Sequence, residues 1–234
     1  MANNNGAAAG DDLSRGETTR RKLITAGIRL FSTYGYDSTS TRMIVQEAGV
    51  NLSAISFHFS SKEALYAACL QFIAAKAEKM YDEAFERAEA LLERGAVTAE
   101  EARRAILEIM HIQLTVAFGK RYQSSLKLVY WEQINAMNSD HPVTTVIFEK
   151  IELVVAKLIS AGAGMPFKNA MVASRFIIGG VISFGEHSLL VKYSLGLETE
   201  GDELPEWIRR QITEHVYSFI DKLFAGAAAE KADS

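Results

Sequence analysis

The side chains of this sequence that are best placed for molecular recognition lie in two short amphipathic segments, one ending at Ala48 and the next beginning at Asn51. Gly49, between them, can adopt the left-handed backbone conformation that ends a helix and turns the chain sharply. This spacing is typical of a helix-turn-helix, whose second helix enters the major groove of DNA. It predicts contacts with base edges and phosphates, not bond-making chemistry.

The first turn of the second segment offers side chains short enough for a close approach to bases. Ser53 can donate or accept a hydrogen bond, and Leu52 and Ala54 can pack on a thymine methyl group. Asn51 is predicted to cap this helix. Arg42, near the start of the first segment, can reach a guanine or a phosphate; the alternative for Arg42 is a solvated surface charge.

The charge of the chain is divided unevenly. The whole sequence carries −4, with 25 Lys and Arg against 29 Asp and Glu. Residues 15–62 hold seven bases and three acids, a local charge of +4, and the first 14 residues hold two acids and no base, so the remainder carries −6. A basic module joined to an acidic body is expected when only one end meets phosphate. The alternative is a chance excess of bases over a short window.

The elements that position these residues are predicted to be helices, because helical periodicity is nearly continuous along the chain and no segment alternates like a strand. We expect a first helix ending at Gly35, short helices on both sides of Gly49, and a fourth helix from Ser61, opened by a capping box of Ser60 and Glu63. Longer helices are predicted at about 98–118, 122–138, 142–161, 167–194 and 204–224, the first of them opened by a capping box of Thr98 and Glu101. The expected fold class is all-α, with about nine helices.

The domain division follows from this pattern. Residues 1–14 are expected to be a disordered tail, 15–62 a three-helix DNA-binding domain with a helix-turn-helix, 63–225 a helical effector-binding and dimerisation domain, and 226–234 a frayed tail. The single cysteine, Cys69, and the lack of a signal-peptide pattern in the first 22 residues favour the cytoplasm. The apolar stretch around Met171 to Val191 is interrupted by polar residues and is expected to be a buried helix, not a membrane span.

The segment TSTRMIVQEAGVNLSAISFHFSSKEALY, from Thr39 to Tyr66, resembles the signature of the TetR family of bacterial transcription regulators. The upstream LFSTYGY also fits the end of that family's first helix. The C-terminal half, through WEQINAMNSDHPVTTVIFEKI, is similar to the CecR-like (YbiH-like) subgroup.

The resemblance implies a DNA-binding role for a set of residues in this segment. The implied set is Thr39, Ser40, Thr41, Arg42, Asn51, Leu52, Ser53, Ala54, Ser56, Phe57, His58 and Lys62. Of these, Thr39, Ser40 and Thr41 are implied to cap the second helix and touch phosphate. Ser56 stands where the family usually has a tyrosine that contacts phosphate, which puts that contact in doubt. His58 has the alternative of a core histidine bonded to the backbone.

The resemblance further implies a homodimer with a small-molecule effector pocket in the C-terminal body, and the effector is expected to be hydrophobic or aromatic. The candidate pocket residues are Met110, His111, Gln113, Leu114, Phe118, Tyr122, Tyr130, Trp131, Phe176, Phe184 and His187, each with plain core packing as its alternative. The helix from Lys168 to Tyr193 is apolar on nearly every face and independently favours a dimer over a purely intramolecular core. The candidate interface residues are Ile177, Val181, Trp207, Ile212, Phe219 and Leu223.

The expected function is a ligand-released repressor that binds a palindromic operator as a homodimer. An activator of the same fold is the first alternative, and a helical protein that binds only protein partners is another. An enzyme is disfavoured because the sequence contains no G-x-S-x-G, no H-E-x-x-H and no glycine-rich phosphate loop, and its five histidines lie far apart. We predict no catalytic residue, no metal and no cofactor.

Overall fold

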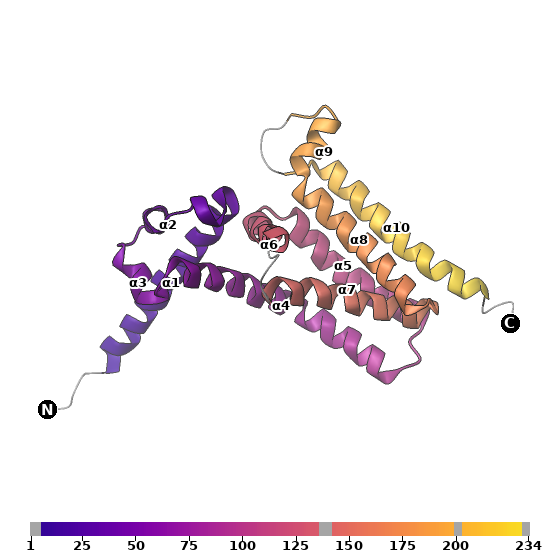
Figure 1. The fold of residues 1–234 in the computed structure, drawn as a ribbon. Coiled ribbons are helices and arrows are strands. Elements are labelled where there is room, and N and C mark those ends of the chain that lie inside the picture. The colour runs from indigo at the N-terminus through magenta and orange to yellow at the C-terminus, as the bar shows by residue number, and fades with distance from the viewer. Residues whose placement is uncertain (1–5, 136–141, 199–202, 231–234) are drawn as a thin grey trace. The chain divides into compact units, whose positions relative to one another are not determined.

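A computed structural model describes residues 6–135, 142–198 and 203–230. In these ranges the chain forms helices and no strand, which confirms the all-α prediction (Figure 1). The helices are α1 (Gly6–Ser38), α2 (Thr41–Ala48), α3 (Ser53–Phe59), α4 (Lys62–Arg94), α5 (Ala99–Phe118), the 3-10 helix η1 (Lys120–Tyr122), α6 (Gln123–Asn135), α7 (Pro142–Ala163), α8 (Phe167–Glu186), α9 (Ser188–Ser194) and α10 (Glu206–Glu230).

The helices form two compact units. Unit 1 comprises Met1–Ala75 and Lys127–Val143, and unit 2 comprises Lys76–Leu126 and Thr144–Ser234. α4 therefore contributes its first part to unit 1 and its remainder to unit 2, and most of α6 belongs to unit 1. The domain division expected between residues 62 and 63 stays a prediction.

Helix extends into both expected tails, since α1 begins at Gly6 and α10 ends at Glu230. Both segments are rich in alanine, which has the highest helix propensity of any residue. Residues 1–5 and 231–234 lie outside the described ranges.

The core of unit 1 forms around Phe31 of α1, which is fully buried. Its ring lies 5.0 Å from that of Tyr66 on α4 and 5.9 Å from that of Tyr36, measured between centroids. α6 joins this core because Leu128 is buried in it and because the Tyr66 hydroxyl donates to the Glu132 carboxylate at 2.6 Å. Burial, followed by the bond to Glu132, raises the pKa of Tyr66 above its usual range.

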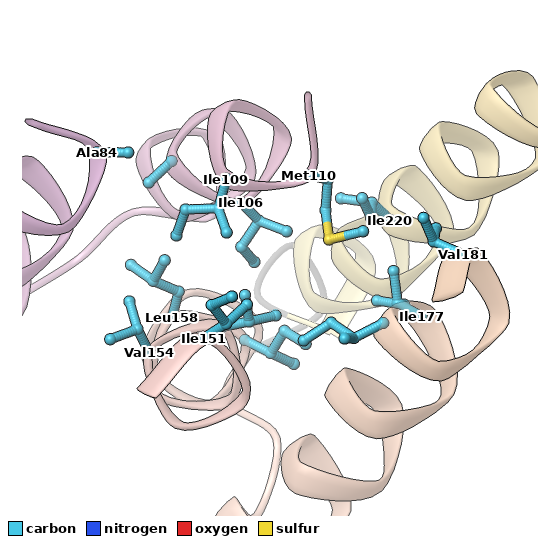
Figure 2. Close-up of a cluster of buried hydrophobic side chains, with 14 of the residues drawn as sticks. Ala84, Ile106, Ile109, Met110, Ile151, Val154, Leu158, Ile177, Val181 and Ile220 are labelled. Atoms are coloured by element: carbon cyan, nitrogen blue, oxygen red, sulfur yellow. The ribbon is translucent and has the colours of Figure 1, made fainter. Parts of the chain in front are cut away.

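The core of unit 2 is larger and consists mainly of aliphatic side chains. Figure 2 shows Ile106, Ile109 and Met110 of α5 directed toward side chains of α7, α8 and α10. These three residues are fully buried, which makes α5 the helix around which unit 2 packs.

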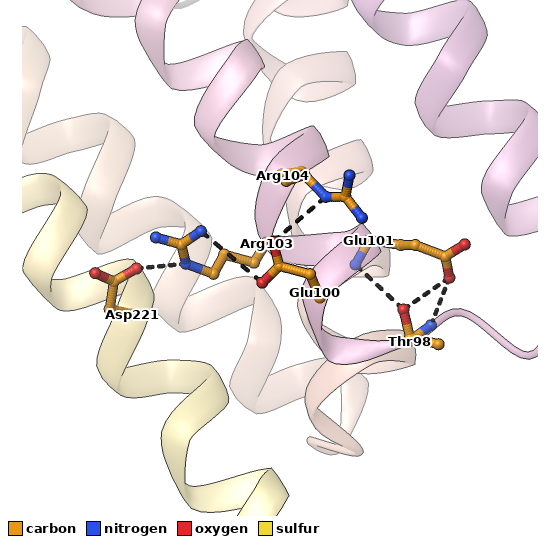
Figure 3. A network of polar contacts seen from close by, with 6 residues as sticks. All are labelled: Thr98, Glu100, Glu101, Arg103, Arg104 and Asp221. Carbon is orange, nitrogen blue, oxygen red and sulfur yellow. Dashed lines mark hydrogen bonds and ion pairs between the residues drawn. The ribbon is translucent and has the colours of Figure 1, made fainter.

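Polar contacts fix the start of α5 and tie it to α10. The Thr98 hydroxyl accepts from the Glu101 N–H at 3.2 Å, and the Glu101 carboxylate accepts from the Thr98 N–H at 3.0 Å, which confirms the predicted capping box (Figure 3). One turn further, Arg103 of α5 donates to Asp221 of α10 at 2.6 Å. The helix therefore begins where the sequence places it.

Two other predicted caps are wrong. α3 has Leu52 at its N-cap position, without a side-chain cap, and the Asn51 backbone carbonyl, not its amide side chain, accepts from the Ala54 N–H at 3.0 Å. Ser61, not Ser60, caps α4 by accepting from the Ala64 N–H at 3.1 Å.

The helix predicted at 167–194 is also interrupted. The backbone leaves the helical conformation at His187 (φ −94°, ψ 30°), which separates α8 from α9. The His187 N–H and its ring Nδ1 both lie within hydrogen-bond distance of the Ser183 carbonyl, at 2.9 and 3.1 Å, so side chain and backbone compete for one acceptor.

Candidate nucleic-acid interface

The backbone of the helix-turn-helix is fixed at both ends of α2. The Ser40 hydroxyl accepts from the Met43 N–H at 3.2 Å, which makes Ser40 the N-cap; of the three residues expected to cap this helix, it is the one that does so. Gly49 ends α2 in the left-handed conformation (φ 63°, ψ 40°), and this also confirms the prediction. Ile44 and Val45 between these ends are buried, so α2 is anchored to the core and its turn leads directly into α3.

α3 divides cleanly into a buried and an exposed face. Ile55 and Phe59 are buried at 4% and 6% exposure, whereas Ser53, Ser56 and Phe57 are exposed. The three exposed residues are spaced i, i+3, i+4 and therefore lie on one side of the helix. Phe57 is 82% exposed. Its ring therefore lies open to solvent beside the two serines on this seven-residue helix.

The predicted phosphate contacts around the start of α2 differ in burial. Thr39 is fully buried, and its hydroxyl donates to the Gly35 carbonyl at 2.7 Å, where the backbone of α1 leaves the helical conformation (φ 77°, ψ 172°). Arg42 is exposed and Thr41 is half-buried. The side chain of Thr39 thus positions the loop before α2, while Arg42 is open to a partner.

Lys62, at the start of α4, is held by an aromatic ring. Its Nζ lies 4.2 Å from the centroid of Tyr36, a cation–π distance. The Tyr36 hydroxyl donates to the Glu63 carboxylate at 2.7 Å. Burial and this bond raise the pKa of Tyr36 to about 12, and the same bond is the main reason that the pKa of Glu63 is lowered to about 2. Sequence reasoning missed Tyr36, whose partners are 26 and 27 residues distant.

The remaining predicted contacts lie along the same short segment. Leu52 is 49% exposed, Asn51 is exposed, and Ala54 is half-buried. His58 is half-buried, with its ring 4.9 Å from that of Phe57 in an edge-on arrangement. Unit 1 therefore brings the exposed members of the predicted set onto α3 and the ends of its two neighbours.

The predicted effector residues are divided between the two units and differ in burial. Met110, Gln113 and Leu114 are buried in unit 2, and the Gln113 side-chain oxygen accepts from the buried Tyr81 hydroxyl at 2.5 Å. Phe118 and Tyr122 are half-buried, and His111 and His187 are exposed. Tyr130 and Trp131 belong to unit 1.

Phe176 and Phe184, also expected in the effector pocket, line an apolar groove of about 580 Å³ between α8 and α10. This α8–α10 groove also receives five of the six predicted dimer residues: Ile177, Val181, Trp207, Ile212 and Phe219. Leu223 packs against the core of unit 2 and is not part of its lining.

No helix in the described ranges is long and apolar enough to cross a bilayer. Within the same residues, no group of three or more His, Cys, Asp or Glu side chains could hold a metal ion.

Known proteins resemble this chain in its DNA-binding segment and over most of its length. The sequence model described as "Bacterial regulatory proteins, tetR family" matches residues 23–69, the segment that contains α2, α3 and the start of α4. The HTH-type transcriptional dual regulator CecR of Shigella flexneri is 27% identical over 206 residues, covering 86% of this chain and 91% of the relative. These matches support a TetR-family transcriptional regulator. Its resemblance to the CecR-like subgroup, inferred from the C-terminal half, is confirmed by the extent of that match.

Solved structures share the fold of this chain. A TetR-like transcriptional regulator from Rhodococcus sp. RHA1 superposes with a TM-score of 0.58 at 16% identity, over 89% of this chain and 96% of the other. A transcriptional regulator from Saccharomonospora viridis, solved in complex with choline, gives a TM-score of 0.58 at 17% identity, over 86% and 95%. The family model and the CecR relative both describe transcription regulators, which supports a regulator over the enzyme alternative.

Proposed function

We propose that this TetR-family regulator is a homodimeric repressor that binds a palindromic operator in the cytoplasm and releases it when a small molecule binds unit 2. The observation that carries this proposal is the exposed face of α3, with Ser53, Ser56 and Phe57 open to a partner. Ser40 and Gly49 hold the supporting helix in place, so this face is preorganised for the groove.

On DNA, each exposed residue of the set has a role set by its chemistry. Ser53 hydrogen-bonds a base edge, Leu52 and Ala54 pack against thymine methyl groups, and Arg42 reaches a guanine or a phosphate. Asn51, Ser56, Phe57, His58 and Lys62 contact the backbone, together with Ser40 and Thr41. Thr39 acts through its bond to Gly35 and does not touch DNA itself.

The occupant of the α8–α10 groove is a second copy of the chain. Phe176 and Trp207 on its rim are 66% and 52% exposed, and burying them against the same surface of another copy removes apolar area from water. A palindrome read by two α3 helices requires such a pair, with the helices about 34–36 Å apart or a multiple of that spacing.

The effector site is proposed for unit 2, around the buried pair of Tyr81 and Gln113. Both side chains are only 2% exposed, and their hydrogen bond is a polar feature in an otherwise apolar core. An apolar or aromatic ligand with one polar group suits that environment. α4 belongs to both units, so it is the helix through which ligand binding alters unit 1.

The division into a DNA-binding domain of residues 15–62 and an effector domain of 63–225 remains part of this proposal. An activator is the second candidate, favoured by one observation: the Shigella flexneri relative is a dual regulator. Transcription from the promoter beside the operator, measured with and without the protein, separates the two signs.

The test is selection of genomic fragments by the purified full-length protein, followed by sequencing of the bound DNA. We expect a palindrome whose half-sites are separated by about one helical turn or a small multiple of it. Binding that depends on salt but selects no sequence would contradict operator recognition.

A further inference from the structure

A second surface of unit 1 is hollowed and positively charged. A cavity of about 450 Å³ lies between α1 and the end of α2, where Arg21, Lys22, Thr25 and Arg29 of α1 face Glu47 and Ala48 of α2. Lys22, Thr25 and Arg29 are spaced i, i+3, i+7 along α1, so their side chains share one face of the helix. We call this cavity the α1–α2 hollow.

The hollow contains three cations and one anion. Arg29 forms an ion pair with Glu47, which joins α1 to α2 at one wall. Arg21 and Lys22 are exposed and make no ion pair with any residue that the structure describes. Two of the three positive charges thus remain available to a ligand, and Thr25 adds a hydroxyl that can donate to it.

The location of the hollow relates it to the recognition helix within the same unit. Ala48 directly precedes Gly49, whose turn leads into α3. Closer to the N-terminus of α1, Gly16 lies close to α3, since a Cβ built there would be 4.0 Å from Cε1 of His58. When α3 enters a major groove, residues that flank its turn are adjacent to the sugar–phosphate backbone.

We propose that the α1–α2 hollow binds a phosphate of the DNA backbone next to the bases read by α3, with Arg21 and Lys22 as its ligands. This inference rests on the proposed operator binding and adds a contact to it. Arg21 supplies a planar fork that matches two phosphate oxygens, and Lys22 supplies a point charge. The contact strengthens binding to all sequences alike.

The experiment compares the wild-type protein with Arg21→Gln/Lys22→Gln on the selected operator and on a scrambled duplex of equal length, from roughly 50 to 200 mM salt. We expect the slope of log affinity against log salt to become shallower by about 0.9 for each phosphate that the variant no longer neutralises. The ratio of operator to scrambled affinity should stay unchanged. Lys127→Gln, an exposed lysine of unit 1 outside the hollow, is the matched control and should keep the wild-type slope.

The outcomes separate the two proposals. A wild-type slope in the double variant overturns the phosphate site and leaves operator recognition intact, whereas a wild-type protein that selects no operator contradicts the proposed function itself. Titration of pyrophosphate into the protein without DNA tests a free phosphate source. Tight pyrophosphate binding that the double variant loses, with an unchanged salt slope on DNA, would assign the hollow to a soluble ligand and overturn the DNA contact.

Discussion

Unit 1 and unit 2 both leave large apolar side chains open, but in different settings. In unit 1, Leu52 lies at the N-cap of the short helix α3 and Phe57 lies within that helix, and both are close in sequence to serines. In unit 2, Phe176 and Trp207 stand along a groove whose lining is almost wholly apolar. A mixed polar and apolar face suits base edges and sugar–phosphate, whereas a continuous apolar groove suits another protein surface. This difference supports the proposal that unit 1 contacts DNA and that unit 2 pairs with a second chain.

The two units also obtain their structure by different means. The geometry of unit 1 depends on backbone features at particular positions, above all the left-handed Gly49 and the Ser40 cap. That of unit 2 depends on burial of aliphatic side chains around α5. Changes to single side chains should therefore have different consequences in the two units.

The largest effect is expected from Ile109→Ala in the core of unit 2. Ile109 is fully buried, and its truncation removes apolar contacts and leaves a cavity, so the free energy of unfolding should fall by about 2–5 kcal/mol. Chemical denaturation measures this change. Leu153→Ala on α7, where the leucine is 39% exposed, is the matched control and should be destabilised much less. Equal destabilisation would show that unit 2 does not depend on the α5 core.

Gly49→Val tests the dependence of unit 1 on its backbone. A Cβ at Gly49 meets nothing within 4 Å, so the cost comes from the positive φ of 63° and not from a clash. A β-branched residue in that conformation should lower the free energy of unfolding by about 1–3 kcal/mol. Gly49→Asn, which tolerates the conformation, should be destabilised clearly less, and similar values in both variants would contradict a backbone origin.

Arg42→Ala tests the proposed DNA contact of unit 1 without disturbing its core, since Arg42 is exposed. If the guanidinium contacts a base edge, operator binding should weaken by about 1–3 kcal/mol, measured by titration of labelled DNA. If it contacts phosphate, the salt dependence should flatten instead. Lys157→Ala, an exposed lysine of unit 2, serves as the control. Unchanged affinity and unchanged salt slope would remove Arg42 from the interface.

The smallest effect concerns acid stability, which we expect to depend on Glu63 in unit 1 and Glu101 in unit 2. Hydrogen bonds, first from Arg94 and then from Thr98, lower the pKa of Glu101 from 4.5 to about 2, and the bond from Tyr36 does the same for Glu63. A lowered folded-state pKa adds stability above pH 4.5 that is lost as the pH falls toward 2. Glu101→Gln and Glu63→Gln should each make thermal stability less dependent on pH in that window. A wild-type pH profile in both variants would contradict these assignments.

Features determined within about four residues were predictable from the sequence. Gly49 and the Thr98–Glu101 capping box are examples, because each depends on local backbone chemistry. Local reasoning failed where neighbouring residues offer equivalent groups, as with Ser60 and Ser61 before α4. The family signature located α3 and its exposed residues for the same reason: the motif is contiguous.

Features that depend on distant contacts were not predictable. α6 joins unit 1 through Glu132 and Tyr66, which are 66 residues apart, and no periodicity in either segment indicates that pairing. Phe176 and Phe184 line the α8–α10 groove, and the sequence could not separate an effector pocket from a dimer surface there, because an aromatic at helical spacing looks the same in both.

The central claim is that two chains pair through the α8–α10 groove and present two α3 helices to one operator. Sedimentation velocity of the full-length protein, alone and on the selected palindrome, tests it most directly. We expect a protein mass of twice the 25.8 kDa chain in both samples, with Phe176→Asp/Trp207→Asp shifting the free protein to monomer while Arg42→Ala leaves it dimeric. A wild-type protein that is monomeric at micromolar concentration and binds the operator as a single chain would contradict this pairing.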